Sequence, residues 1–200
     1  MANGTTVAAS VYYSDTTTYT GNAGSKTNPY CIEDLYDLIK NPTINKKPAS
    51  EDLYYYYIVV NDIDMSDYDD YKYSPPLGIS LYIKKIDFKN HELRNITFYN
   101  THIYSQTIFN IHNADNFNSS IHNLKLTNFI SYNSIITVFY LDEASRGAAL
   151  FFYNCNFSIY ADATLLNSLA FKIISIDAND GYYIYCYNCI FNIKANLSSY

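Results

Sequence analysis

The sequence predicts an all-β protein whose strands wind into a parallel β-helix, a solenoid of stacked coils. Composition is the first reason, because the 200 residues include 24 Tyr and 11 Phe but only 6 Gly and 5 Pro. Aromatic and β-branched residues suit the pleated, half-buried surface of a strand. The other reasons are a short motif that recurs along the chain and a β-rich run before each copy. A chain of this length is expected to form one domain with a substantial core.

The repeated motif has Asn at its third position. The hexamer "FYNCNF" (152–157) nearly repeats as "CYNCIF" (186–191), and "FYNTHI" (98–103) and "LTNFIS" (126–131) share the apolar-x-Asn pattern. The four Asn residues are Asn100, Asn128, Asn154 and Asn188. Their irregular separations of 28, 26 and 34 residues are typical of a solenoid whose loops vary in length. A weaker match, "FKNHEL" (88–93), is assigned to the same structural turn as the first copy.

Stacked coils place equivalent residues one strand spacing apart, about 4.8 Å. We therefore expect the four Asn side chains to form one hydrogen-bonded ladder, with Cys155 and Cys189 as neighbours in the core. The alternative is chance similarity in a chain rich in Asn and Tyr that folds as an ordinary sandwich or barrel. The runs that favour the solenoid are "SLYIKKIDF", "QTIFNIH", "SIITVFYL" and "FKIISID".

Residues 1–50 are predicted to form an extended segment and a capping helix, followed by the β-helix domain at 51–200. The stretch "SDTTTYTGNAGSKTNP" has the composition of a loop. The next stretch, "CIEDLYDLIKNP", spaces apolar residues at helical intervals and ends in Asn-Pro. The apolar face comprises Ile32, Leu35, Tyr36 and Ile39. We expect this helix to cover the first coil, because a solenoid needs a terminal cap.

Charge and hydropathy exclude several functional classes. The formal charge of −6, with only 13 Lys and Arg, argues against nucleic acid as a partner. The sequence contains no stretch of 18 apolar residues, so no membrane span is predicted. The start "MANGTTVAASVYYS" does not have the pattern of a secretory signal. We expect a location on a virion surface or outside a cell, reached without such a signal.

Three stretches resemble the pectin-lyase-like family of right-handed parallel β-helices, as found in phage tail or fibre proteins and bacterial surface proteins. They are "GSKTNPYCIEDLYDLI" (24–39), "YIVVNDIDMSDY" (57–68) and "IDFKNHELRNITFYN" (86–100). The resemblance covers most of residues 20–195 and implies a fold rather than an activity. The chain departs from the family in its scarcity of Gly and its few coils.

Three carboxylates form the candidate site for a ligand or cation. Asp115, Asp142 and Asp177 each follow a β-rich run and precede a motif Asn by 13, 12 and 11 residues, so coils in register would align them along one edge. The family resemblance implies calcium binding or lyase chemistry for such clusters, and two carboxylates about 5–10 Å apart could also serve a glycosidase. Turn chemistry is the simpler explanation, because Asp bonds its own backbone in loops. We therefore assign no catalytic residue, cofactor or metal.

A cysteine pair and a tyrosine cluster near the end of the sequence are weaker candidates for a functional site. Cys186 and Cys189 have zinc-like spacing, but a second ligand pair is missing, so structural thiols are expected. Tyr182, Tyr183 and Tyr185 are candidates for an interface or for stacking on sugars, because Tyr is enriched in recognition surfaces. The alternative is that such residues only shield the outer face of a strand.

These features predict a non-enzymatic structural or adhesion protein of a phage virion: a tail fibre, head fibre or capsid decoration protein involved in host attachment. The final "NIKANLSSY" has no obvious cap, so we expect a homotrimer or attachment to other virion proteins, with a cell-surface glycan as a further candidate partner. The alternatives are a polysaccharide lyase or hydrolase and a bacterial surface binding module.

Overall fold

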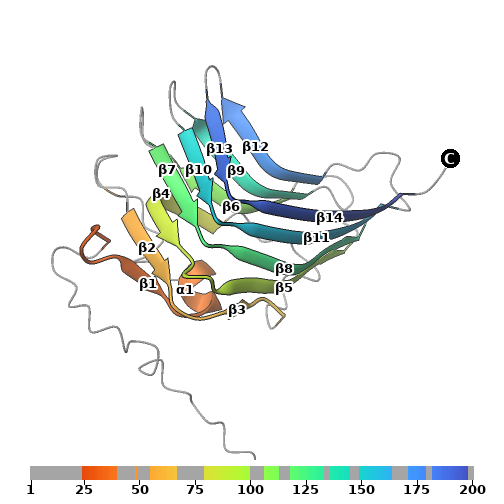
Figure 1. Cartoon of the computed structure of the whole chain (residues 1–200), viewed down its shortest axis with the longest axis horizontal. Helices are drawn as coiled ribbons and strands as arrows, with labels where there is room; N and C mark the ends of the chain where they lie inside the picture. Colours follow the sequence, from red (N-terminus) through yellow and green to blue (C-terminus); the bar gives the residue numbers. More distant parts are fainter. Residues whose placement is uncertain are drawn as a thin grey trace, which may run out of the picture.

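The computed structural model describes residues 24–39, 48, 55–66, 79–99, 106–112, 118–132, 136–144, 149–163, 171–178 and 182–197. Nearly all of them lie in parallel strands (Figure 1). The elements are β1 (Tyr30–Ile32), α1 (Leu35–Ile39), β2 (Tyr55–Val59), β3 (Ile63–Asp64), β4 (Ile79–Asp87), β5 (Glu92–Tyr99), β6 (Gln106–His112), β7 (Asn118–His122), β8 (Lys125–Tyr132), β9 (Ile136–Ala144), β10 (Ala149–Tyr153), β11 (Asn156–Ala163), β12 (Phe171–Ala178), β13 (Tyr183–Tyr187) and β14 (Ile190–Leu197).

The strands stack in three columns. The first column is β4, β6, β9 and β12; the second is β1, β2, β4, β7, β10 and β13; the third is β3, β5, β8, β11 and β14. The first two columns form one nine-stranded sheet that bends at β4, whose first half pairs with β6 and whose second half pairs with β7. All pairings between these strands are parallel. From β4 onward, the chain visits the columns in the same order in every coil.

This topology confirms an all-β protein with parallel sheets and is compatible with a parallel β-helix. Parallel strands cannot be joined by tight hairpins, so successive strands in the chain lie in different columns and return one coil later. Figure 1 shows the coils progressing from β1 to β14. The last coil comprises β12, β13 and β14.

The core lies between the columns and is filled by alternate residues of each strand. In β10, Leu150 and Phe152 are buried, whereas Phe151 and Tyr153 point outward and are partly exposed. Burial of each large apolar side chain contributes about 1.5–3 kcal/mol. Phe109 and Phe139 stack in neighbouring coils with ring centroids 5.3 Å apart. Equivalent positions therefore pack on one another along the axis of the coils.

The structure does not show the predicted capping helix over residues 32–39. Ile32 belongs to β1, where it pairs with Val59 of β2, and α1 has only five residues. Strand pairing has overridden the helical spacing of the sequence at this point. Leu38 of α1 is nevertheless fully buried in the core, and Asp34 caps the helix by accepting the Asp37 N–H at 3.0 Å. No helix among the described residues is long and apolar enough to cross a membrane.

Candidate functional site

The corner between the second and third columns is built on Asn residues in the left-handed backbone conformation. Asn123, Asn154 and Asn188 have φ of 56°, 55° and 53° and join β7 to β8, β10 to β11 and β13 to β14. Asn tolerates this region better than other residues with a side chain. The Asn154 amide donates to Asn123 Oδ1 at 3.2 Å, and the Asn188 amide donates to Asn154 Oδ1 at 3.4 Å. These three residues are called the corner ladder.

Two of the four predicted ladder residues, Asn154 and Asn188, therefore stack, and the prediction for Asn128 is wrong. Asn128 does not lie in the corner ladder: its amide donates to Asn95 Oδ1 at 2.6 Å, in a separate pair within β5 and β8. Asn95 and Asn128 are also left-handed, and β8 carries an extra residue opposite β11 at this point, which is a bulge. Asn100 lies outside the described residues.

The strand register shows which hexamers occupy equivalent positions at the corner. "IHNLKL" (121–126) is the correct match to "FYNCNF", because the register aligns Ile121 with Phe152 and Leu126 with Phe157. "LTNFIS" (126–131) instead matches "LRNITF" (93–98), since Leu93 pairs with Leu126. In the sequence, the corner site and the bulge site differ in the apolar residue after Asn, which is Leu124 at the corner and Phe129 at the bulge. This difference is too small to distinguish the two sites reliably. Both sites need a left-handed residue, so both look alike in sequence.

The corner ladder and the pair of Asn95 and Asn128 each begin at an aspartate of the preceding coil, which accepts a hydrogen bond from the first Asn amide. Asp87 Oδ1 accepts the Asn123 amide at 2.8 Å and the Lys89 N–H at 2.9 Å, and Lys85 lies 3.3 Å from Oδ2. Burial opposes ionisation of Asp87, but these donors outweigh it and lower its pKa. Asp87 is thus held as a structural carboxylate.

The second aspartate begins the series of Asn95 and Asn128. Asp64 accepts the Ser66 N–H at 2.9 Å and the Asn95 amide at 2.8 Å. Hydrogen bonds from Ser66 and Asn95, with Arg94 beside them, lower the pKa of Asp64 well below its usual range. This carboxylate is also occupied by structural donors.

A third carboxylate links successive coils. Asp62 accepts the Glu92 N–H at 2.9 Å and lies 3.2 Å from His91 Nδ1 and 3.6 Å from Arg94. The Glu92 N–H is the main cause of its lowered pKa, and His91 and Arg94 add to it. Within the described residues, no three His, Cys, Asp or Glu side chains are arranged to hold a metal ion.

The predicted carboxylate edge is only partly visible. Asp142 and Asp177 lie near the C-terminal ends of β9 and β12, which are neighbours, and Asp142 is in register with His112 of β6. The register between β9 and β12 shifts at this point, between Ile176 and Ala178. The side chains of these two residues and all of Asp115 lie outside what the structure describes, so the edge stays a prediction.

The thiols repeat along the core as predicted for Cys155 and Cys189. Cys155 Sγ donates to Tyr153 O at 3.4 Å, and Cys189 Sγ donates to Tyr187 O at 3.5 Å, one coil later. Burial raises the pKa of Cys155 to about 12. All four cysteines are free thiols, and the buried Cys155 is a packing residue.

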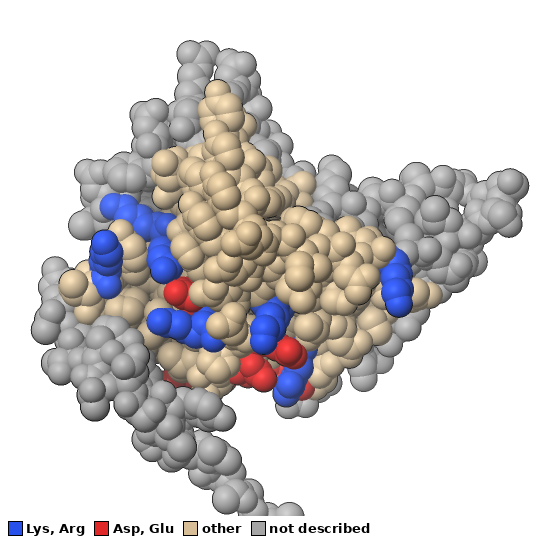
Figure 2. All heavy atoms as spheres, viewed as in Figure 1, with Lys and Arg blue, Asp and Glu red and all other residues tan. Residues whose placement is uncertain are grey.

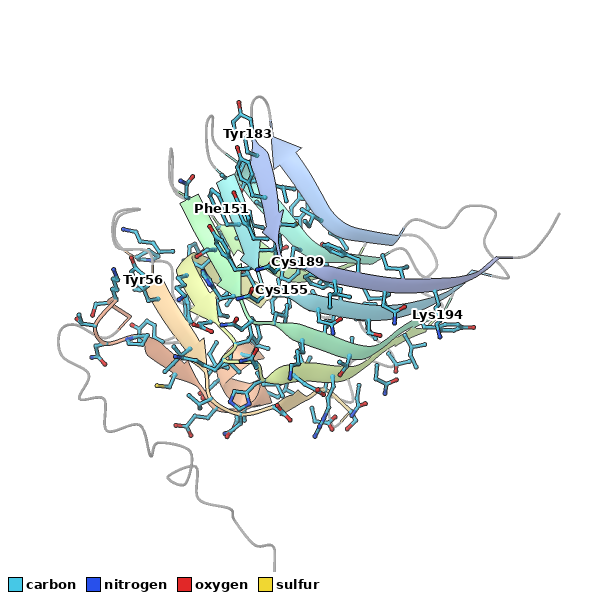
Figure 3. The ribbon with its side chains drawn as sticks, viewed as in Figure 1. Tyr56, Phe151, Cys155, Tyr183, Cys189 and Lys194 are labelled. Atoms are coloured by element: carbon cyan, nitrogen blue, oxygen red, sulfur yellow. The ribbon has the colours of Figure 1, made fainter. Side chains whose placement is uncertain are left out.

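The last coil exposes a set of large apolar side chains. The exposed fractions are 55% for Tyr183, 41% for Tyr185, 47% for Tyr187, 60% for Ile190, 44% for Phe191 and 46% for Ile193. Two of the three predicted tyrosines belong to this set; Tyr182 packs against the core instead, and Tyr187 was missed. Figure 3 shows Tyr183 at the tip of β13 and Cys189 deeper at the corner.

Aromatic rings stack from coil to coil and end at this surface. Tyr185 lies on Phe151 with centroids 4.9 Å apart, and Tyr187 lies on Tyr153 at 5.0 Å. In the core, Phe191 lies on Phe157 at 5.1 Å, and the interplanar angle is 11°. Because these rings are stacked along the coil axis, each ring of the last coil presents its second face in the direction of the next coil.

The strand edges of the last coil are open as well. β12, β13 and β14 each end their column, and each pairs with one neighbour only among the described strands. An edge strand presents a row of unpaired N–H and C=O groups that another strand can bind. We call β12, β13 and β14, with the exposed side chains named above, the open end.

A shallow groove lies on the outer side of the third column. Its volume is about 220 Å³. The lining residues are Asn128, Phe129, Ile130, Ser158, Ile159, Tyr160, Asn192 and Lys194. The groove includes Asn128, where β8 has its extra residue opposite β11.

Comparisons with known proteins add no assignment. No family model matches the chain, and neither the curated proteins nor the solved structures contain a match to it.

Proposed function

We propose that this protein is a non-enzymatic structural or adhesion protein that forms a right-handed, pectin-lyase-like parallel β-helix and assembles through its open end. The setting we propose is a phage virion, in which the chain is a tail fibre, a head fibre or a capsid decoration protein. Three parallel columns visited in a fixed order support the β-helix, and crossovers between parallel strands are right-handed in nearly all proteins.

The observation that carries the proposal is the contrast between the two ends of the strand stack. At the first end, Leu38 of α1, Ile63 of β3 and Met65, which follows β3, are buried. At the open end, Phe191 and Ile193 continue the core columns but remain exposed. Uncovered core positions with unpaired strand edges are typical of an interface rather than of a solvated surface.

The carboxylates support a structural role. Asp62, Asp64 and Asp87 each accept hydrogen bonds from neighbouring coils, and their lowered pKa values keep them ionised. A general acid needs a raised pKa near the working pH, which is the opposite shift. These residues hold the turns of the coils in place.

The first test measures turnover. Purified protein is incubated with neutral and uronate-containing polysaccharides, and released reducing ends and unsaturated products are measured. We expect no release above a heat-denatured control. Release that is lost in a variant with Asp115→Asn, Asp142→Asn and Asp177→Asn would instead support the carbohydrate-active enzyme.

The second test concerns location. Mass spectrometry of purified particles from the genome that encodes the chain is expected to detect the protein at a stoichiometry above that of contaminants. Its absence from particles, or a genome that produces none, would overturn the virion proposal and leave the bacterial surface module. The predicted homotrimer, other virion partners and an extracellular location stay predictions.

For adhesion to a cell-surface glycan, the groove of the third column is the place to test first. Tyr160, Asn192 and Lys194 offer a ring, an amide and a cation within one groove. Binding to a glycan array that weakens in Asn192→Ala and Tyr160→Ala would support it. Binding that is unchanged in both variants would place any glycan elsewhere.

A further inference from the structure

We propose that the open end binds the open end of a second copy of this chain, giving a two-fold dimer whose coils run continuously through the interface. This inference rests on the proposed function, which assigns the open end to assembly, and it names the partner. Its geometry follows from the edges, the ring faces and the lengths of the last three strands.

Two of the three edge strands, β13 and β14, largely lack the features that keep natural edges apart, whereas β12 carries Lys172, Asp177 and a register shift near its end. β13 reads "YIYCY" and carries no charge, and β14 reads "IFNIKANL" with Lys194 as its one charged residue. No Pro or Gly interrupts β12, β13 or β14. Free edges are usually protected by charged residues, Pro or bulges. On the face shown in Figure 2, the charged side chains gather over the first coils, and the described part of the last coils is largely uncharged apart from Lys194, labelled in Figure 3.

The area is sufficient for a stable dimer. The last coil contains strands of 8, 5 and 8 residues. At about 3.3 Å per residue and a width of about 10 Å, these 21 residues present roughly 700 Å². Two copies would then bury roughly 1,400 Å², which lies within the range of about 1,200–2,000 Å² for specific interfaces.

The lengths of the last three strands determine which two-fold axis would relate the two copies. A two-fold axis perpendicular to the coil axis reverses the strand direction, so facing edges pair antiparallel. Such an axis pairs one column with itself and exchanges the other two. If β13 pairs with β13 of the second copy, β12 meets β14, and both of these have eight residues. Any other choice sets a strand of eight residues against one of five.

The side chains also fit this arrangement. The outward rings of Tyr183, Tyr185 and Tyr187 are parallel to one another within about 21°, with centroids 6.3 and 6.5 Å apart along β13. Their second faces would stack on the same three rings of the second copy, as Tyr185 already stacks on Phe151. Phe191 and Ile193 would be covered by inward residues such as Ile174 of the partner's β12.

The first experiment measures dimer dissociation by sedimentation over a range of concentrations. The variant Ile193→Lys places a charge in the interface, and Asn118→Lys places the same charge on an exposed residue of β7 in an inner coil. We expect a dimer for the unmodified chain and for Asn118→Lys, and a dissociation constant raised roughly 100-fold or more for Ile193→Lys, since the charge is buried without a partner. Circular dichroism confirms that each variant is folded.

The second experiment tests the symmetry. In a background of Cys186→Ser and Cys189→Ser, a single cysteine replaces Tyr183, Tyr185 or Tyr187. Residue 185 is the middle of β13 and faces itself across the axis, whereas 183 faces 187. Mild oxidation should therefore give covalent dimers mainly with Tyr185→Cys. Any other order among the three variants overturns the proposed pairing.

The two proposals can fail separately. A folded monomer or a trimer at all concentrations overturns the two-fold dimer, yet the virion and turnover measurements would still decide the structural function. Loss of association in Asn118→Lys as severe as in Ile193→Lys would show that the open end is not the interface. Conversely, a dimer with the expected cross-link that degrades polysaccharide would overturn the proposed function only.

Discussion

The two ends of this molecule are built from the same parallel strands but differ in how their core residues are covered. At the first end, Ile32, Leu38 and Ile63 are buried, although β3 has only two residues and α1 only five. At the open end, strands of eight residues leave Phe191 and Ile193 about half exposed. Strand length alone therefore does not seal a stack of coils. At the first end, residues outside the strands, Leu38 of α1 and Met65, also belong to the buried core.

The largest expected difference in stability is between Ala variants of two stacked phenylalanines. Phe157 is fully buried, and Phe191 lies on it but is 44% exposed. We expect Phe157→Ala to lower the free energy of unfolding by about 3–5 kcal/mol, because it leaves a cavity in the core. Phe191→Ala should cost about 1 kcal/mol. Urea denaturation, at concentrations where sedimentation shows monomers, measures both. Equal losses would contradict an open end.

A smaller effect on stability is expected at the first end, from a substitution of Gly24. Its φ is +82°, and a Cβ atom there would lie 2.6 Å from Tyr30 Cε2 and 2.7 Å from Tyr55 Cδ1. Gly24→Ala should therefore lower stability by about 2–3 kcal/mol through backbone strain and displacement of the two rings. Lys26→Ala, at an exposed neighbouring residue, is the control. A melting temperature that is unchanged in Gly24→Ala would show that this end tolerates rearrangement.

Acid should weaken the hydrogen bond that Asp87 accepts from Asn123, the first residue of the corner ladder. The pKa of Asp87 is lowered in the folded protein, so its contribution is present above the unfolded pKa of about 3.9 and is lost as pH falls through the folded value. Asp87→Ala should cost about 2 kcal/mol at neutral pH, because the Asn123 amide loses its acceptor.

Asp87→Asn is the matched variant, since its amide oxygen can still accept those hydrogen bonds. It should retain most of the stability at neutral pH and show a weaker dependence on acid. Thermal melts from pH 7 to about pH 2 compare the three proteins. Parallel pH curves for the unmodified protein and Asp87→Asn would show that the carboxylate does not stabilise the fold.

The smallest expected effects compare the middle and the end of the corner ladder. Asn154 takes part in two ladder hydrogen bonds, and Asn188 takes part in one. Asn154→Ala should cost about 1–2 kcal/mol and Asn188→Ala about half of that, from lost bonds and the left-handed backbone. Asn154→Gly and Asn188→Gly keep the backbone conformation and isolate the hydrogen bonds. Equal losses in the two Ala variants would argue that the backbone dominates.

The sequence predicted the strands and the most similar coils well. The repeat of "FYNCNF" as "CYNCIF" identified true neighbours, because Phe152 pairs with Cys186 and Phe157 with Phe191. It misplaced "LTNFIS", since Asn128 at a bulge and Asn154 at a corner satisfy the same left-handed requirement. The helix at 32–39 was overestimated because the pairing of Ile32 with Val59 is a contact between distant residues.

Residue type by itself determined the β-rich character of this chain and the positions where the backbone turns left-handed. Those properties depend on local sterics, which a single residue and its neighbours express. The tertiary structure alone decided which Asn side chains meet, that Tyr182 packs inward while Tyr187 is exposed, and which end of the core stays uncovered. These outcomes depend on loop lengths and on strands that pair about 30 residues apart, and the energy of such contacts appears only once the coils are stacked.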